Sequence, residues 1–250
     1  MTTYVLVHGA WSGAHSWRRL RPLLAGAGHA VFTPSLTGLG ERAHLISPQV
    51  DLTMHVLDVV NHVVYEDLRD VVLVGHSYGG AVVTGALDHI ADRVRHLVFL
   101  DAFVPAHGES VATLAGGGLA PLLEPPAGSA PDEQTPTREW LTREWLIPPS
   151  PRDFGDPAEQ AWSDARRRPH PVRCLTEPVV LRRPLEEHDL TLTYVKATAE
   201  PESAPGNAAF WAAARHAAES PRWAGHEIAT THVVQHHEPE ALAALLLALG

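Results

Sequence analysis

The chain has 250 residues, a length typical of one large α/β domain. Hydrophobic residues make up 45% and charged residues 19%, so a sizeable core is available, and the net charge of -10 argues against a nucleic-acid or anionic-membrane surface. The single cysteine, Cys174, excludes an internal disulfide and a cysteine-based zinc site.

Strand-like and helix-like segments alternate over the first hundred residues. Short apolar runs predict buried strands, and apolar positions at helical spacing predict helices. The expected strands are 4–7, 30–36, 71–74 and 96–103. The expected helices are 16–27, 52–68 and 78–90. This alternation predicts βαβ units and a mostly parallel central sheet flanked by helices.

The alternation breaks after Pro105. No clean strand is visible up to about Leu185, and nine prolines fall between Pro121 and Pro157. Short helix candidates in this stretch carry Trp140, Trp145 and Trp162, which favours a cap with an aromatic face over a flexible linker. We therefore expect a core of residues 1–104 and 186–250 and a cap insertion at 105–185.

The alternation resumes in the last third of the chain. We expect a strand at 190–197, a helix at 208–218, a weak strand at 226–229 and an apolar closing helix at 239–249. Residues 1–11 lack a basic segment and a long apolar core, and no stretch approaches the ~20 apolar residues of a membrane span. The expectation is a cytoplasmic protein without a membrane partner; monomer and homodimer both stay open.

The strongest motif is Gly75-His76-Ser77-Tyr78-Gly79, between a predicted buried strand and a predicted helix. It fits G-x-S-x-G, in which a serine hydroxyl is exposed on a sharp strand-to-helix turn. The glycines suit a strained turn whose neighbouring backbones pass closely. The competing interpretation is a glycine-rich turn with a helix-capping serine. We predict that Ser77 is a nucleophile.

A serine nucleophile needs a base, and in the order serine, acid, histidine the base comes late in the chain. His232 follows the weak strand and precedes the last helix, so it is the predicted base. His226 is a further C-terminal candidate, and His236 and His237 are interpreted as solvated residues. His232 and His236 have the spacing of a metal pair, but no HExxH glutamate accompanies them, so no metal site is expected.

Two carboxylates compete for the third position. Asp101 ends the apolar run 97–100, where a semi-buried carboxylate needs a charged or hydrogen-bonding partner such as an imidazolium. Glu200 follows the 190–197 strand in a polar stretch where water could solvate it. Asp101 is favoured, and Glu200 stays an alternative.

A tetrahedral oxyanion requires two donors. The backbone N–H groups of Tyr78 and Ala10 are the candidates, since they follow the nucleophile and the first strand. His8 is expected to hydrogen-bond within the fold, and Trp11 and Trp17 are expected to pack in the core.

These motifs resemble those of α/β-hydrolases, in particular the small esterases grouped with plant methylesterases, hydroxynitrile lyases and bacterial pyrethroid-type carboxylesterases. The resemblance lies in residues 5–11, 36–42, 74–80 and 100–105. It implies an eight-stranded sheet whose first strand or two are often missing in small members, a helical cap, and cofactor-free ester hydrolysis.

Hydroxynitrile lyases of this group carry threonine and lysine where this chain has Ala10 and Val233, which argues against cyanohydrin cleavage. Plant members place an aspartate after the later strand, whereas this chain has Asp101, as dehalogenase-like relatives do.

The resulting hypothesis is a serine esterase. His232 accepts the Ser77 proton, Asp101 orients the imidazole, and the N–H groups of Ala10 and Tyr78 hold the oxyanion. Trp140, Trp145 and Trp162, with Tyr78 at the floor of the site, predict a small apolar or aromatic substrate. Two alternatives stay open: other chemistry at the same site (thioesterase, cyclase or lyase), and a non-catalytic small-molecule-binding protein.

Overall fold

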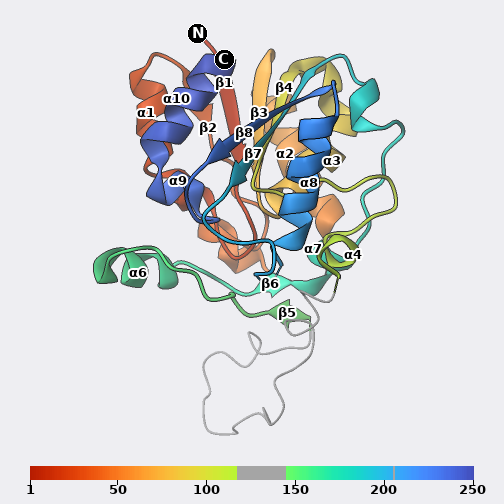
Figure 1. Ribbon diagram of the computed structural model, residues 1–250. Helices are drawn as coiled ribbons and strands as arrows, with labels where there is room; N and C mark the ends of the chain where they lie inside the picture. Colours follow the sequence, from red (N-terminus) through yellow and green to blue (C-terminus); the bar gives the residue numbers. More distant parts are fainter. Residues whose placement is uncertain (117–144, 205) are drawn as a thin grey trace, which may run out of the picture.

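The computed structural model describes residues 1–116, 145–204 and 206–250. A six-stranded, fully parallel sheet forms its centre, in the order β2-β1-β3-β4-β7-β8 (Figure 1). The strands are β1 (Thr3–Val7), β2 (Ala30–Phe32), β3 (Val71–His76), β4 (Val94–Leu100), β7 (Thr191–Ala197) and β8 (Trp223–Ile228). The predicted parallel sheet is confirmed, with the strand number expected when the first two of eight are missing.

Helices cover both faces of this sheet (Figure 1). One face carries α1 (Leu20–Gly26) and α10 (Pro239–Leu249), and the other carries α2 (Leu52–Tyr65), α3 (Gly79–Ile90) and α8 (Ala208–Glu219). A short helix, α9 (Val234–His237), precedes α10. Both faces of the strands are therefore buried, which explains their continuous apolar sequences.

Alternate residues of each strand point into two separate cores. In β1, Tyr4 and Leu6 pack beneath α1 and α10, whereas Val5 and Val7 pack beneath the helices of the other face. This follows from the two-residue period of a strand.

Several predicted elements are shorter than expected. The strand expected at 30–36 ends at Phe32, just before Pro34, which has no N–H for the ladder. The strand expected at 96–103 ends at Leu100, because the backbone turns at Asp101, whose φ is 42°. The helix expected at 16–27 is divided into a 3₁₀ turn at Ala14–Trp17 and α1.

The described parts of residues 105–185 hold short elements. They are α4 (Val111–Ala115), β5 (Leu146–Ile147), α6 (Pro157–Asp164), β6 (His170–Pro171) and α7 (Val172–Thr176). Strands β5 and β6 form a small antiparallel pair apart from the main sheet. Trp162 lies on a helix as predicted, whereas Trp145 directly precedes β5, and Trp140 lies outside the described residues.

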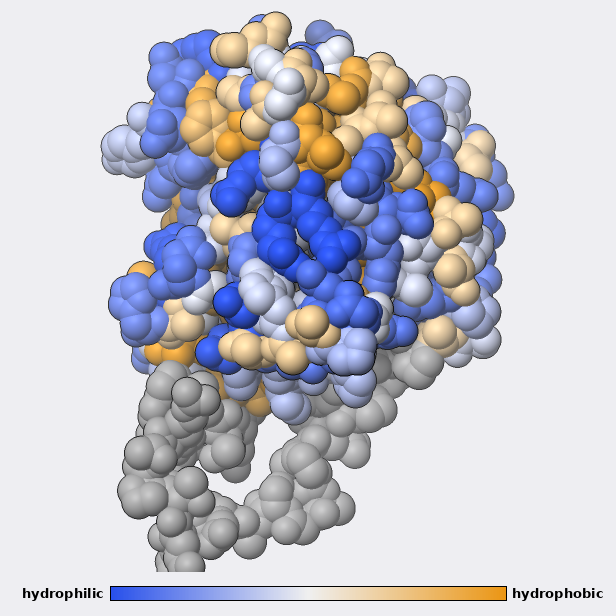
Figure 2. Space-filling model, turned by 90° about the vertical axis from the view of Figure 1, so that its left-hand side faces the viewer, coloured by the Kyte–Doolittle hydropathy of each residue, from blue (hydrophilic) through white to orange (hydrophobic). Residues whose placement is uncertain are grey.

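The hydropathy of the surface varies over the face that carries α1 and α10 (Figure 2). Hydrophobic residues gather in its upper part, while its centre is hydrophilic. The last helix contributes the partly buried Leu245, Leu247 and Leu249. Across residues 1–116, 145–204 and 206–250, every helix is too short or too polar to traverse a bilayer.

Candidate active site

Ser77 lies on a tight turn between β3, which ends at His76, and α3, which begins at Gly79. Its φ of 56° lies in the left-handed region that non-glycine residues rarely adopt. A Cβ on Gly75 would lie 2.7 Å from the carbonyl oxygen of Gly79, and one on Gly79 would lie 2.7 Å from that of Val7. Strand and helix approach this closely only because both positions are glycine.

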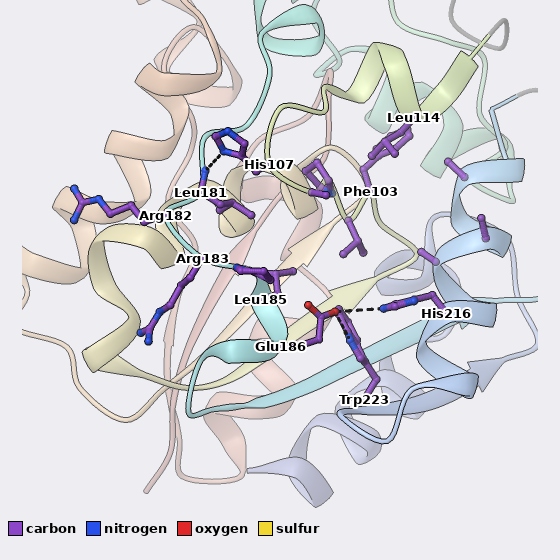
Figure 3. A pocket seen from close by; sticks show the side chains of 17 residues that line it. Phe103, His107, Leu114, Leu181, Arg182, Arg183, Leu185, Glu186, His216 and Trp223 are labelled. Atoms are coloured by element: carbon purple, nitrogen blue, oxygen red, sulfur yellow. Dashed lines mark hydrogen bonds and ion pairs between the residues drawn. The ribbon is translucent and has the colours of Figure 1, made fainter.

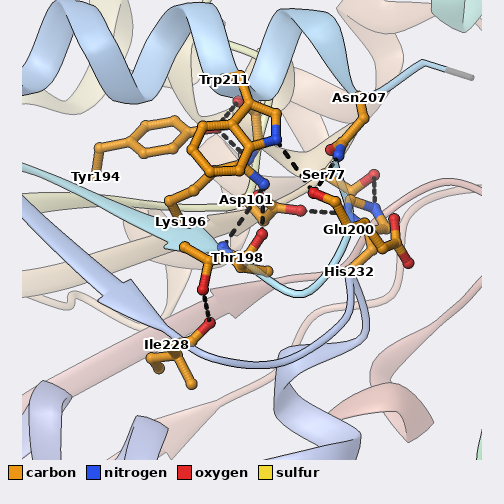
Figure 4. Close-up of polar contacts among 12 residues, drawn as sticks. Ser77, Asp101, Tyr194, Lys196, Thr198, Glu200, Asn207, Trp211, Ile228 and His232 are labelled. Carbon is orange, nitrogen blue, oxygen red and sulfur yellow. Dashed lines mark hydrogen bonds and ion pairs between the residues drawn. The ribbon is translucent and has the colours of Figure 1, made fainter. Parts of the chain in front are cut away.

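Ser77, His232 and Asp101 form a continuous hydrogen-bonded chain (Figure 4). The His232 Nε2 atom is 2.9 Å from Ser77 Oγ, and its Nδ1 atom is 2.7 Å from Asp101 Oδ2. Since a carboxylate only accepts, Nδ1–H donates to Asp101 and leaves Nε2 to accept the serine proton. Three segments far apart in the sequence therefore meet at the carboxyl ends of the strands.

The end of β4 places Asp101 between two strands. Leu100 is opposite Val195 in the β4–β7 register, so the next residues of both strands are also neighbours. Asp101 Oδ1 accepts hydrogen bonds from Lys196 Nζ at 2.8 Å and from the Ala197 N–H at 3.2 Å. The side chains of Asp101 and Lys196 are each only 1% exposed, so this ion pair is fully buried.

Glu200, the alternative acid, is not hydrogen-bonded to His232. Its backbone carbonyl accepts hydrogen bonds from Asn207 Nδ2 at 3.0 Å and from Trp211 Nε1 at 3.2 Å. The carboxylate within hydrogen-bond distance of His232 is that of Asp101.

Sequence reasoning missed Lys196. It is the single lysine of the chain, and it lies in the otherwise apolar strand β7. Its Nζ also donates to the Ala197 carbonyl at 2.5 Å and lies 4.7 Å from the centroid of the Trp211 ring. The sequence did contain a signal for this ion pair. A lone lysine within a predicted buried strand indicates a nearby carboxylate, because a buried cation requires a partner.

Aromatic rings and a hydrogen bond hold His232 in position. Phe210 stacks on its ring at a centroid distance of 4.9 Å and an angle of 13°. His76 Nε2–H donates to the His232 carbonyl at 2.8 Å, and Gln235 donates to His76 Nδ1 at 3.3 Å. Burial lowers the pKa of His232 below its ordinary value, against the opposing effect of Asp101. Burial likewise lowers the pKa of His76 to about 3, so His76 is a neutral support.

The two predicted oxyanion donors flank Ser77. A Cβ on Gly9 would lie 2.9 Å from Ser77 Cβ, which shows how closely the loop after β1 approaches the serine, and Ala10 follows in that loop. Tyr78 follows Ser77 and caps the start of α3. Its side chain is 1% exposed, and its hydroxyl donates to His55 Nδ1 at 2.8 Å. The phenol is thus part of the core and not of the cavity at Ser77, contrary to the expectation that it forms the floor.

The packing expectations are confirmed for His8 and Trp17, whereas Trp11 is largely buried but also lines the cavity at Ser77. His8 Nδ1–H donates to the carbonyl of the following residue at 2.8 Å, and its Nε2 accepts from the Leu36 N–H at 3.1 Å. Trp17 is completely buried, and Trp11 is 8% exposed with its indole N–H bonded to the Ile147 carbonyl at 3.0 Å.

A cavity of about 60 Å³ opens onto Ser77 and His232. Three aromatic and two cationic side chains share its lining: Trp11, Phe154, Trp162, Arg152 and Arg167. Of the tryptophans predicted to bind substrate, Trp162 lines this cavity, Trp145 is not among its lining residues, and Trp140 lies outside the described residues.

A larger cavity of about 800 Å³ lies beside α8 (Figure 3). Its polar edge is formed by Glu186, which accepts from Trp223 Nε1 at 3.0 Å and lies 3.3 Å from His216 Nε2. Phe103 lines this cavity, but neither Ser77 nor His232 does. The hydrogen-bonded serine therefore faces the smaller cavity.

A buried polar cluster lies near Tyr78. Potential ligand atoms of His55, His170 and Cys174 lie within 4.8 Å of one another. However, His55 Nε2–H donates to the Thr37 carbonyl at 2.9 Å while its Nδ1 accepts from the Tyr78 hydroxyl. Burial also raises the pKa of the Cys174 thiol. Both nitrogens of His55 are thus engaged in hydrogen bonds, so this imidazole would have to give up one of them to bind a metal ion.

The prediction that His236 is a solvated residue is wrong. Its side chain is 8% exposed, and its Nε2–H donates to the Phe154 carbonyl at 3.0 Å. The segment around Phe154, more than eighty residues away in sequence, covers it. His232 precedes α9 while His236 lies within it, so the two do not share a helical face.

Comparisons with known proteins agree with this architecture. The family model described as "Alpha/beta hydrolase family" matches residues 4–245. A carbendazim hydrolyzing esterase from Nocardioides sp. is 51% identical over 121 residues, which cover 48% of this chain and 50% of that protein. An alpha-hydroxynitrile lyase from Arabidopsis thaliana is 36% identical over 108 residues, 41% of this chain and 40% of that protein. The matches thus span about half or less of these curated relatives.

Solved structures extend the similarity over the full chain. An extracellular alpha/beta-hydrolase from a Paenibacillus species covers 100% of this chain and 99% of its own, with a TM-score of 0.72 and 24% identity. At that identity the likeness concerns the fold. Taken with the family match over residues 4–245, it shows that the chain belongs to the alpha/beta hydrolase family.

Proposed function

We propose that this protein is a serine hydrolase that cleaves carboxylic esters of small substrates with an apolar or aromatic part, without a cofactor. The hydrogen-bonded chain Ser77–His232–Asp101 is the observation that carries the proposal. A serine hydroxyl becomes a nucleophile when a positioned base accepts its proton, and a buried carboxylate stabilises the imidazolium that results.

In this mechanism His232 Nε2 removes the proton from Ser77 Oγ as the oxygen attacks the ester carbonyl. The N–H groups of Ala10 and Tyr78 donate to the developing oxyanion. His232 then protonates the departing alcohol, which leaves an acyl group on Ser77. Water attacks this acyl-enzyme with His232 again as base, and the carboxylic acid is released.

We further propose that residues 105–185 form a cap over the core of residues 1–104 and 186–250. In support, β4 and β7 are adjacent in the sheet although the insertion separates them, and its described part contributes no strand to that sheet. Arg152 and Trp162 of the insertion line the cavity at Ser77, which supports a role in substrate contact.

The relatives support ester hydrolysis over the alternatives. One is named as a carbendazim hydrolyzing esterase and another as a methylesterase. One is named as an alpha-hydroxynitrile lyase. The resemblance described in the sequence analysis implies threonine and lysine in hydroxynitrile lyases of this group, at the positions where this chain has Ala10 and Val233.

The test is turnover of p-nitrophenyl acetate and butyrate by the wild type, Ser77→Ala and Ser12→Ala, with intact mass measured after treatment with a fluorophosphonate. Ser12 lines the same cavity and serves as the matched control. We expect the wild type and Ser12→Ala to turn over and to label once, and Ser77→Ala to do neither. Labelling of Ser77 without turnover of any ester would favour different chemistry at the same serine. Neither labelling nor turnover would refute the hydrolase proposal.

A further inference from the structure

The cavity at Ser77 is cationic although the chain as a whole is acidic. Arg152 and Arg167 line it, and no aspartate or glutamate is among its lining residues in the described part of the chain. The net charge of the whole protein is -10. The positive charge in the cavity is therefore a local arrangement.

Both guanidinium groups lack a carboxylate partner within the described residues. No aspartate or glutamate oxygen there lies within 4.0 Å of either group. Arg167 Cζ lies 5.8 Å from the centroid of the Phe154 ring. Other arginines of the same region do have partners: Arg18 and Arg19 both pair with Glu159.

Two of the nearby carboxylates, those of Asp101 and Asp164, are held by other groups. Asp101 is held by Lys196 and His232, and Asp164 accepts from Gln160 Nε2 at 2.8 Å. Glu200 and Asp101 act on Arg152 only at longer range.

The two arginines also destabilise each other. Burial, followed by the positive charge of Arg152, lowers the pKa of Arg167 to about 10. Burial also lowers the pKa of Arg152 below its ordinary value. Carboxylates at longer range, Glu200 and Asp101 for Arg152 and Asp164 for Arg167, oppose this effect in part. Two partly buried cations without an ion-pair partner in the described residues favour the binding of an anion.

We propose that Arg152 and Arg167 form a carboxylate-binding subsite, so that the preferred substrates are esters that carry a carboxylate beside an apolar or aromatic part. This inference rests on the proposed ester hydrolysis and names the substrate class. A guanidinium presents donors that match both oxygens of a carboxylate. The aromatic side chains Trp11 and Trp162 line the same cavity and suit the apolar part.

The test compares 3- and 4-acetoxybenzoate with the corresponding acetoxybenzamides, which have the same shape and no charge. We expect the wild type to have a kcat/KM about tenfold or more higher for one of the benzoates than for its benzamide, as a charge-assisted hydrogen bond predicts. Arg152→Gln and Arg167→Gln should each remove most of this preference, because they lower kcat/KM for the benzoates more than for the benzamides. Arg69→Gln removes the same charge from an exposed arginine that does not line the cavity, so it should behave like the wild type.

Calorimetry of benzoate, benzamide and inorganic phosphate binding to the same variants tests for the carboxylate-binding subsite independently of turnover. Binding of benzoate that is lost in Arg152→Gln and Arg167→Gln supports the subsite, even if no ester is cleaved and the hydrolase proposal fails. The inference is overturned if the wild type treats the charged and neutral esters alike, or if benzoate binds no better than benzamide. Phosphate binding as tight as that of benzoate, without a preference for the charged esters, would also overturn it.

Discussion

Asp101 receives hydrogen bonds from two groups that carry or acquire positive charge, His232 and Lys196. Burial by itself would raise the pKa of this carboxyl, but the interactions with His232 and Lys196 lower it below its ordinary value. Lys196 thereby helps to keep Asp101 ionised, and it also shares the negative charge that would otherwise act on His232 alone. Lys196 is a positioning residue in this arrangement, since it touches Asp101 and not the serine.

The lowered pKa of His232 predicts activity on the acid side of neutrality. The group is a base only when neutral, and burial moves its pKa below 6.5. We expect kcat/KM for a neutral ester, measured from about pH 5 to about pH 8, to fall only below pH 6.5. An acid limb with its midpoint above pH 6.5 would contradict the burial of this imidazole.

Replacing Lys196 by methionine keeps most of the side-chain volume and removes the charge. Asp101 then acts more strongly on His232, so the pKa of His232 rises and the acid limb moves upward by about one pH unit. The control, Arg215→Met, removes a positive charge from an exposed site on α8, where the side chain is 52% exposed, and should leave the limb in place. An unchanged limb in Lys196→Met would mean that the lysine acts only on folding.

At the scale of elements, the strand–turn–helix unit of β3 and α3 follows most directly from local sequence. About twenty residues specify this unit: an apolar run, a glycine on each side of the serine, and apolar residues at helical spacing. The unit lies where it was predicted. The ends of β2 and β4 were harder to predict from the sequence. Strand β2 ends before Pro34, and β4 ends where the backbone turns at Asp101 toward β7.

The close approach at this turn predicts a sharp cost for a single methyl group. Gly79→Ala would place a Cβ 2.7 Å from a backbone carbonyl oxygen, so we expect the free energy of unfolding to fall by about 1–3 kcal/mol in urea titrations. Gly26→Ala in α1 is the matched control, because nothing lies within 4 Å of a Cβ there and alanine favours a helix. Similar destabilisation by both variants would refute the steric explanation.

At the scale of the whole molecule, histidine burial is the dominant electrostatic feature. Eight of the 17 histidines are buried, and each of them has a lowered pKa, chiefly because burial disfavours the charged form. They are His8, His55, His76, His96, His170, His188, His232 and His236. For His8 and His76 the pKa falls to about 3.

This burial predicts acid sensitivity. Unfolded imidazoles titrate near pH 6.5, so below that pH the unfolded chain binds more protons than the folded one. The contribution of these neutral histidines to the free energy of unfolding is therefore fully present above pH 6.5 and is lost as the pH falls from there toward 3. His8 and His76 alone predict a loss of about 3 kcal/mol between about pH 6.5 and about pH 5.

Urea unfolding at several pH values measures this loss. His44→Gln, which removes an exposed histidine, should show the same slope as the wild type. A free energy of unfolding that stays constant between about pH 6.5 and about pH 5 would contradict the neutral burial of these imidazoles.

The sequence by itself determined the parallel α/β architecture, the position of Ser77 on its turn and the choice of His232 as its expected partner. Each depends on local pattern: an apolar run, a glycine spacing, or a place in the order of strands. The competition between Asp101 and Glu200 could not be resolved in this way, because both follow predicted strands.

Only the tertiary structure decided which carboxylate meets His232, since that depends on how β4 and β7 lie side by side. It also revealed the partnership of Lys196 with Asp101 and the convergence of Arg152 and Arg167 on Ser77. Lys196 and Asp101 are in contact although they lie 95 positions apart, and Arg152 lines the same cavity as Ser77 from 75 positions away. No local sequence pattern predicts such neighbours. Side chains so distant in sequence become neighbours only when the packing of the whole chain fixes their directions.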